Sequence, residues 1–160
     1  MTISVGDTLP ASTFMTMTAD GPQPVASADY FKGRRVALFS VPGAFTPTCS
    51  AKHLPGFVES EAALKAKGVD EIACTAVNDV FVMNAWGKSA TADGKVTMLA
   101  DGNGSFASDI GLTMDGSKFG LGTRGSRWSM LVNDGKVEQL NVEEGGAFEV
   151  SSAGHLLGQL

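Results

Sequence analysis

The sequence predicts one α/β domain over residues 1–160, with a mixed central β-sheet and helices on both faces. Short apolar runs alternate with segments of helical spacing, and a strong hairpin signal follows near the carboxyl end. The length of 160 residues suits a single compact domain. Hydrophobic residues make up 43% of the chain and charged residues only 18%, which argues against disorder and against a coiled coil.

The first strong strand signal is the apolar run at residues 35–41, which follows the turn residues Lys32 and Gly33. Its length and composition predict a buried strand. Pro42, Gly43 and Pro47 then exclude regular structure until about residue 46. We therefore expect a stiff loop directly after the strand.

A helix is predicted to begin at the end of this loop. Thr46 followed by Pro47 is typical of a helix start, with Thr as the N-cap and Pro at the first helical position, where its missing N–H has no cost. Cys49 then falls at about the third helical residue. The helix is expected to end at Gly68, with a kink at Pro55.

The later elements follow the same alternation of strand and helix. They are a strand at 71–77, a helix at 80–88 capped by Asn78 or Asp79, a strand at 96–100, a short helix at 105–110, strands at 128–133 and 136–141 around the hairpin signal Asp134-Gly135, and a last helix from Ser151 or Ser152. This order of elements is typical of the thioredoxin-like fold.

Charge and cysteine content exclude several classes of protein. Twelve Lys and Arg against 17 Asp and Glu give a net charge of −5, which argues against nucleic acid or an anionic membrane as the main partner. No apolar stretch approaches the roughly 18 residues of a membrane span, and the amino terminus shows no signal peptide. Two cysteines form neither a disulfide framework nor a zinc site. We expect a cytoplasmic protein with reduced cysteines and no metal.

Cys49 is the main candidate for chemistry. At a helix N-terminus it faces free backbone N–H groups and the positive end of the helix dipole, and both favour the thiolate. Thr46, one turn earlier, brings a hydroxyl within reach of the sulfur or of a bound ligand. Pro42 and Pro47 stiffen the loop and shield one side of the pocket from water. The alternative is that Cys49 is only a small buried hydrophobic residue.

The segment around Cys49 closely resembles the active-site segment of peroxiredoxins of the type II, or peroxiredoxin-five, group. The resemblance extends over most of the chain and is carried by VPGAFTPTCSAKHLPGFVE, GVDEIACTAVND, GKVTMLADGNGSFASDIGL and TRGSRWSMLVNDGKV. It implies that Cys49 is the peroxidatic cysteine, which attacks a peroxide and becomes a sulfenic acid. By the same resemblance Thr46 orients the peroxide, Arg127 stabilises the thiolate and the developing oxygen charge, and Pro42 closes the pocket. From the residues alone Arg127 is an ordinary surface charge, and only the resemblance favours it over Arg124.

The resemblance also predicts substrates and partners. The substrates are hydrogen peroxide and alkyl hydroperoxides, the reductant is glutathione, glutaredoxin or thioredoxin, and the chain forms a homodimer without haem, flavin or metal. Animal-type members carry a second, resolving cysteine near the carboxyl end, but residues 148–152 contain none here. A one-cysteine cycle recycled by glutathione or glutaredoxin is therefore expected.

Three other residues are open to alternative interpretations. His53 lies one turn after Cys49, a pairing that suggests a protease-like dyad or a metal ligand. No third group supports either, so a pocket histidine with local hydrogen bonds is favoured; His155 has no motif that brings it near. Cys74 is expected to be inert in a central strand, and Trp86, Phe119 and Trp128 are expected in the core or an interface, with the core favoured.

Two rival functions use the same cysteine. A thiol–disulfide oxidoreductase on this fold needs Cys-x-x-Cys, and Thr46 stands where its first cysteine would be. A peroxide sensor or redox-regulated holdase would form the same sulfenate without turnover. Repeated cycling with an added reductant distinguishes a catalyst from a sensor.

Overall fold

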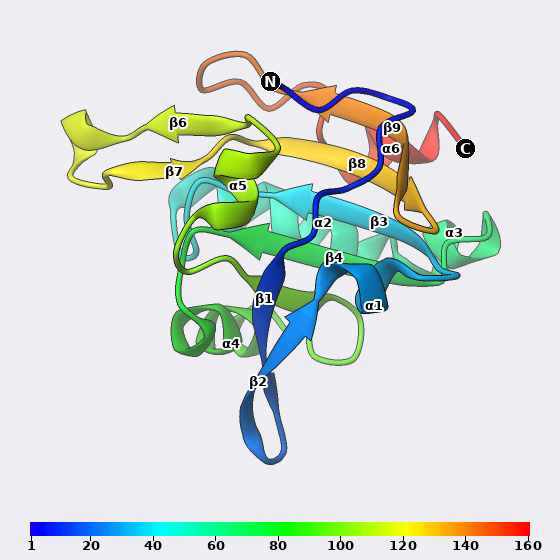
Figure 1. The fold of residues 1–160 in the computed structure, drawn as a ribbon, viewed down its shortest axis with the longest axis horizontal. Coiled ribbons are helices and arrows are strands. Elements are labelled where there is room, and N and C mark those ends of the chain that lie inside the picture. The colour runs from blue at the N-terminus through cyan, green and yellow to red at the C-terminus, as the bar shows by residue number, and fades with distance from the viewer.

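The computed structural model describes residues 1–160 and contains one large sheet. Its strands are β1 (Thr13–Thr18), β2 (Gly21–Ala26), β3 (Arg35–Ser40), β4 (Glu71–Ala76), β5 (Thr97–Ala100), β8 (Trp128–Asn133) and β9 (Lys136–Val142). The spatial order is β2-β1-β5-β4-β3-β8-β9 (Figure 1). β3, β4 and β5 run parallel, while β1 pairs antiparallel to β5 and β8 pairs antiparallel to β3. The edge strands β2 and β9 pair antiparallel to β1 and β8. The sheet is therefore mixed, as expected.

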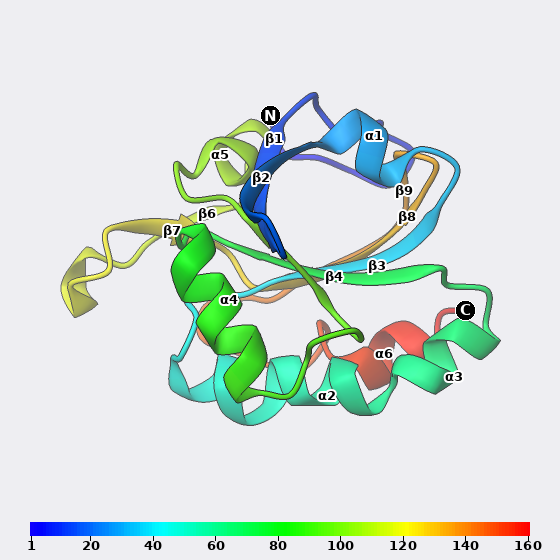
Figure 2. The ribbon, with the colours of Figure 1, turned by 90° about the horizontal axis from the view of Figure 1, so that it is seen from below.

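Helices cover both faces of this sheet (Figure 2). One face carries α2 (Leu54–Glu59), α3 (Glu61–Ala66), α4 (Val80–Ser89) and α6 (Ala153–Leu157), and the other carries α1 (Ser27–Phe31) and α5 (Ser105–Asp109). Because side chains alternate along a strand, Ala37 and Phe39 of β3 join the core under α2, whereas Val36 and Leu38 join the opposite core. No helix has both the length and the apolar character to cross a membrane.

The expected strands and the hairpin are confirmed, with boundaries that differ by one residue or less. The hairpin between β8 and β9 turns at Asp134 and Gly135, whose φ angles of 50° and 79° suit the two-residue turn predicted there. Several elements were not predicted from the sequence: β1, β2 and α1, and the small sheet of β6 (Thr113–Asp115) and β7 (Thr123–Gly125), which flank the short 3₁₀ turn η2 (Ser117–Phe119).

The prediction of a single helix from Thr46 to Gly68, kinked at Pro55, is wrong in detail, because the segment contains three helical elements. The helix begins at Pro47, but Cys49–His53 form a π-helix, η1, in which the Leu54 N–H donates to the Cys49 carbonyl. α2 and α3 follow and are separated at Ser60. Pro55 has no N–H and its ring crowds the preceding turn, so the wide π turn just before it accommodates the proline in place of a simple kink.

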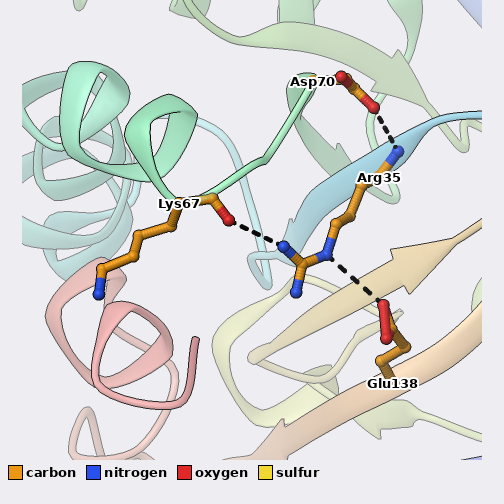
Figure 3. Close-up of polar contacts among 4 residues, drawn as sticks. All are labelled: Arg35, Lys67, Asp70 and Glu138. Carbon is orange, nitrogen blue, oxygen red and sulfur yellow. Dashed lines mark hydrogen bonds and ion pairs between the residues drawn. The ribbon is translucent and has the colours of Figure 1, made fainter.

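Arg35 connects the start of β3 to two neighbouring elements (Figure 3). Its backbone N–H donates to Asp70 Oδ2 at 2.8 Å, and its Nη1 donates to the Lys67 carbonyl at 2.8 Å. Its Nε lies 3.6 Å from Glu138 of β9. These contacts lie at the surface and add little stability individually, but they fix the end of α3 against the sheet.

Candidate active site

Cys49 lies in the first turn of the helix that follows β3, where it joins the core under α2 and is fully buried. The first helical hydrogen bond runs from the Ser50 N–H to the Thr46 carbonyl at 2.9 Å. Pro47 is therefore the first helical residue and Cys49 the third, which confirms the predicted placement. A residue in the first turn lies at the positive end of the helix dipole, among the N–H groups that have no helical acceptor.

The loop before this helix is held by one hydrogen bond within it and one to the segment after β4. The Thr46 hydroxyl donates to the Gly43 carbonyl at 2.7 Å, and the Ala44 N–H donates to Asn78 Oδ1 at 2.9 Å. Phe45 adopts a positive φ of 65°, an uncommon conformation for a large side chain. The Thr46 hydroxyl makes no hydrogen bond to the sulfur. Its proton is used within the loop, and its oxygen remains an acceptor for a ligand.

Arg127 reaches the sulfur from the segment just before β8. Its Nη2 donates to Cys49 Sγ at 3.1 Å, and its Nη1 donates to His53 Nδ1 at 2.9 Å. Its guanidinium also lies 5.8 Å from the centre of the Phe148 ring. Arginine stays charged at all relevant pH values, so this contact stabilises negative charge on the sulfur.

His53 is fully buried and neutral. Its Nε2–H donates to the Ser151 carbonyl at 2.9 Å, which leaves Nδ1 as the acceptor for Arg127. Burial, reinforced by the Arg127 charge, lowers the pKa of His53 from 6.5 to about 3. Both ring nitrogens are thus occupied and neither contacts the sulfur. The structure supports the interpretation of a locally bonded pocket histidine over a general base or metal ligand.

Comparison with known proteins agrees with this geometry. The family model described as Redoxin matches residues 4–157. The chain belongs to the redoxin family. Peroxiredoxin-2E-2, chloroplastic, of Oryza sativa subsp. japonica is 52% identical over 98% of this chain and 72% of its own length. Peroxiredoxin-2B of Arabidopsis thaliana is 48% identical over 97% and 96%.

A solved structure of a peroxiredoxin is also similar to this chain. The crystal structure of reduced Prx3 in complex with H2O2 from Vibrio vulnificus superposes with a TM-score of 0.95, at 47% identity over 98% of each chain. The thioredoxin-like fold predicted from the sequence is confirmed. The chain is a peroxiredoxin, that is, a thiol-dependent peroxidase.

Arg124 has no role predicted from the sequence, yet in this peroxiredoxin it reaches from β7 to the loop before Cys49. Its Nε donates to the Leu121 carbonyl at 2.9 Å, and its Nη1 donates to the carbonyl of the half-buried Pro42 at 3.3 Å. A Cβ on Gly43 would lie 3.0 Å from the same Nη1, so only glycine leaves the guanidinium its full space. Arg124 therefore holds the loop at Pro42, as Asn78 holds it at Ala44, and it makes no hydrogen bond to the sulfur.

Cys74 is a buried thiol of β4, opposite Phe39 of β3, as expected from its strand position. Burial, and next the proximity of Cys49, raise the pKa of the Cys74 thiol well above its ordinary value, and Arg127 only partly offsets this. Both cysteines are free. Trp86 and Trp128 are buried in the core, as favoured by the sequence. The favoured core placement of Phe119 is wrong, because Phe119 lies in η2 at the end of the protruding β6–β7 hairpin (Figure 1) and is 79% exposed; the interface alternative is left for it.

The histidine in this site makes stability depend on pH. The unfolded chain binds a proton at His53 near pH 6.5, whereas the folded chain binds it only near pH 3. The contribution of neutral, buried His53 to the free energy of unfolding is therefore complete above pH 6.5 and is lost as the pH falls toward 3. We expect the free energy of unfolding to fall below pH 6.5 with a slope of up to about 1.4 kcal/mol per pH unit.

Urea unfolding at a series of pH values between about 5 and 7 tests this slope. The pKa of the Glu143 carboxyl is lowered from its ordinary value of 4.5, so this group changes the free energy of unfolding only below about pH 4.5. His53→Phe should remove the slope in this range, and His155→Gln, at an exposed position on α6, should retain it. An unchanged slope in His53→Phe would contradict the assignment.

Proposed function

We propose that Cys49 is the peroxidatic cysteine of a type II, peroxiredoxin-five-like enzyme that reduces hydrogen peroxide and alkyl hydroperoxides. The observation that carries the proposal is the 3.1 Å contact between Arg127 Nη2 and the sulfur in the first turn of a helix. Two sources of positive charge, a guanidinium and a helix N-terminus, then act on one buried thiol. Cys74 has no such contact.

Oxidation of Cys49 by a peroxide needs only the thiolate, the peroxide and a proton from solvent. The Cys49 thiolate attacks the terminal oxygen of the peroxide, a sulfur–oxygen bond forms and the O–O bond breaks. The sulfur loses two electrons, and the leaving hydroxide or alkoxide takes up from solvent the proton that the Cys49 thiol released on forming the thiolate. The products are a sulfenic acid and water or an alcohol. Arg127 stabilises the leaving oxygen as charge develops on it, and the Thr46 oxygen accepts a hydrogen bond from the peroxide hydroxyl. The loop from Pro42 keeps bulk water away from the sulfur.

Recycling is proposed to use glutathione or glutaredoxin, or thioredoxin, as an external thiol. Residues 148–152 hold no cysteine, so no partner in that segment traps the sulfenate. A first thiol forms a mixed disulfide with Cys49 and releases water, and a second thiol restores the Cys49 thiol and leaves as a disulfide. Cys49 is fully buried, so this attack requires local opening of the turn at η1.

We also propose that the chain forms a homodimer, and exposed aromatic residues support this. Phe45, beside Thr46 in the active-site loop, is 55% exposed, and Phe119 on the β6–β7 extension is 79% exposed. Large apolar side chains at such positions are typical of contact surfaces. Sedimentation of the purified chain over a concentration series tests the dimer.

A panel of reductants tests the proposed reaction. Hydrogen peroxide and an alkyl hydroperoxide are each supplied in excess with glutathione alone, with glutathione plus glutaredoxin, and with a thioredoxin system. We expect many turnovers per Cys49 with at least one of these thiols. Consumption that stops after one equivalent of peroxide under every reductant would favour the sensor or holdase alternative.

The second cysteine gives an independent prediction for recycling. Cys74 lies within β4 and its thiol stays protonated, so we expect Cys74→Ser to retain near-wild-type turnover with glutathione or glutaredoxin. After one equivalent of peroxide, mass spectrometry should find sulfenic acid on Cys49, and a glutathione adduct once glutathione is added. A Cys49–Cys74 disulfide as the main product, with turnover lost in Cys74→Ser, would contradict the one-cysteine cycle.

A further inference from the structure

A closed ring of hydrogen bonds connects Glu143 to the guanidinium that contacts Cys49. The Glu143 backbone N–H donates to the Arg127 carbonyl at 3.0 Å, and Arg127 Nη1 donates to His53 Nδ1 at 2.9 Å. His53 Nε2–H donates to the Ser151 carbonyl at 2.9 Å. The Ser151 N–H and hydroxyl then donate to Glu143 Oε2 at 2.8 and 2.6 Å, which closes the ring.

The Glu143 carboxylate is buried without a cationic partner. The residue is 8% exposed, and neither ion pair of the protein includes it. In addition to Ser151, the backbone N–H groups of Glu149 and Val150 donate to it at 2.9–3.0 Å. Burial raises the pKa of Glu143, but the Ser151 hydroxyl and these N–H groups outweigh it and hold the pKa below its ordinary value. A charged acceptor for consecutive N–H groups fixes a segment more firmly than a neutral one does.

We propose that Glu143 is a positioning residue for the reaction at Cys49, acting through the Ser151 carbonyl and His53 on the Arg127 guanidinium. The proposal deepens the proposed function, because it rests on the assigned roles of Cys49 and Arg127. Glu143 touches neither the sulfur nor the place of the peroxide, and its effect is on where Arg127 Nη2 lies.

The His53 tautomer transmits this effect. A carbonyl oxygen only accepts hydrogen bonds, so the Ser151 carbonyl selects the tautomer with its proton on Nε2. Nδ1 is then free to accept from Arg127, which anchors one arm of the guanidinium while the other arm contacts the sulfur. With the proton on Nδ1 instead, two N–H groups would face each other and Arg127 would turn away from Cys49. Glu143 holds the segment that supplies the selecting carbonyl.

Glu143→Gln tests the proposal, because glutamine has nearly the same size but loses the negative charge and one of the two acceptor oxygens. If its amide oxygen takes the place of Oε2, its N–H₂ faces the Glu149 N–H. We expect the second-order rate constant for oxidation of Cys49 by hydrogen peroxide to fall about tenfold. Ring ¹⁵N NMR should show His53 with a protonated Nε2 in the wild type and a mixture of tautomers in Glu143→Gln. Glu144→Gln removes the same charge at an exposed neighbour and should change neither measurement.

A double-mutant cycle separates positioning from general support of the fold. If Glu143 acts through His53, Glu143→Gln should cost no further rate in a His53→Phe background. Ser151→Ala, which removes only the hydroxyl donor to the carboxylate, should give a smaller loss of about twofold and a smaller tautomer change, and it serves as the variant if Glu143→Gln does not fold.

Three outcomes would overturn the proposal. The first is that Glu143→Gln lowers the melting temperature but leaves the oxidation rate and the His53 tautomer unchanged. The second is that the rate losses of Glu143→Gln and His53→Phe are additive in the double mutant. The third is that Ser151→Ala retains the wild-type rate and tautomer. Failure of the proposed function looks different, since the wild type and Glu144→Gln would then also leave Cys49 unoxidised.

Discussion

Replacing Cys49 with serine is expected to abolish peroxide reduction, with a loss of at least about 10³-fold relative to the wild type. A serine hydroxyl is essentially un-ionised at neutral pH, so the Arg127 guanidinium has no anion to stabilise, and oxygen cannot take the place of sulfur in forming a sulfenic acid. Peroxide consumption with excess glutathione and glutaredoxin measures the loss directly.

Serine is smaller than cysteine but fits the same buried position, so the variant should fold. Unchanged far-ultraviolet circular dichroism and cooperative unfolding would confirm this. Cys74→Ser is the matched control, because it makes the same substitution in the same core without touching Arg127. Substantial peroxidase activity in Cys49→Ser, or its loss in Cys74→Ser alone, would move the reaction to the other cysteine.

Local signals in the sequence were sufficient for most of the elements near the site. Thr46-Pro47 predicts the helix start that places Cys49 in its first turn, and Asp134-Gly135 predicts the hairpin of β8 and β9. Both rest on backbone conformations that a few adjacent residues determine. The side-chain preferences of a short segment are enough to predict features of this kind.

The first hairpin shows where local signals fail. β2 contains Pro22 and Pro24, which argue against a strand, and the structure accommodates them because β2 lies at the edge of the sheet. Phe119 fails for a related reason. Its hydrophobicity predicts burial, but the β6–β7 hairpin carries it away from both cores.

The contacts that complete the active site depend on tertiary structure. His53 and Ser151 are 98 residues apart, and Arg124 and Pro42 are 82 residues apart. Hydrophobic periodicity in a single sequence does not indicate hydrogen bonds between residues so far apart. The resemblance to a family was sufficient to single out Arg127, but it gave no reason to expect Arg124 on the loop or Glu143 behind Ser151.

The two arginines give the sharpest test of the site geometry. Arg127 uses both arms of its guanidinium at once, Nη2 on the sulfur and Nη1 on His53. Lysine retains the charge but offers a single ammonium group, which does not hold both contacts in one geometry. We expect Arg127→Lys to lower the rate constant for oxidation of Cys49 about 10²-fold, and Arg127→Gln, which also loses the charge, about 10³-fold.

Stopped-flow oxidation by hydrogen peroxide measures these rates, and thiolate absorbance at neutral pH, with Cys49→Ser as the blank, reports the ionisation of the sulfur. Arg127→Gln should reduce the thiolate signal and Arg127→Lys should largely preserve it. Arg124→Gln is the matched control: its guanidinium contacts only the carbonyls of Leu121 and Pro42, so we expect a rate loss below about tenfold and an unchanged thiolate signal. A larger loss in Arg124→Gln than in Arg127→Gln would show that the loop contact, and not the contact with the sulfur, limits the reaction.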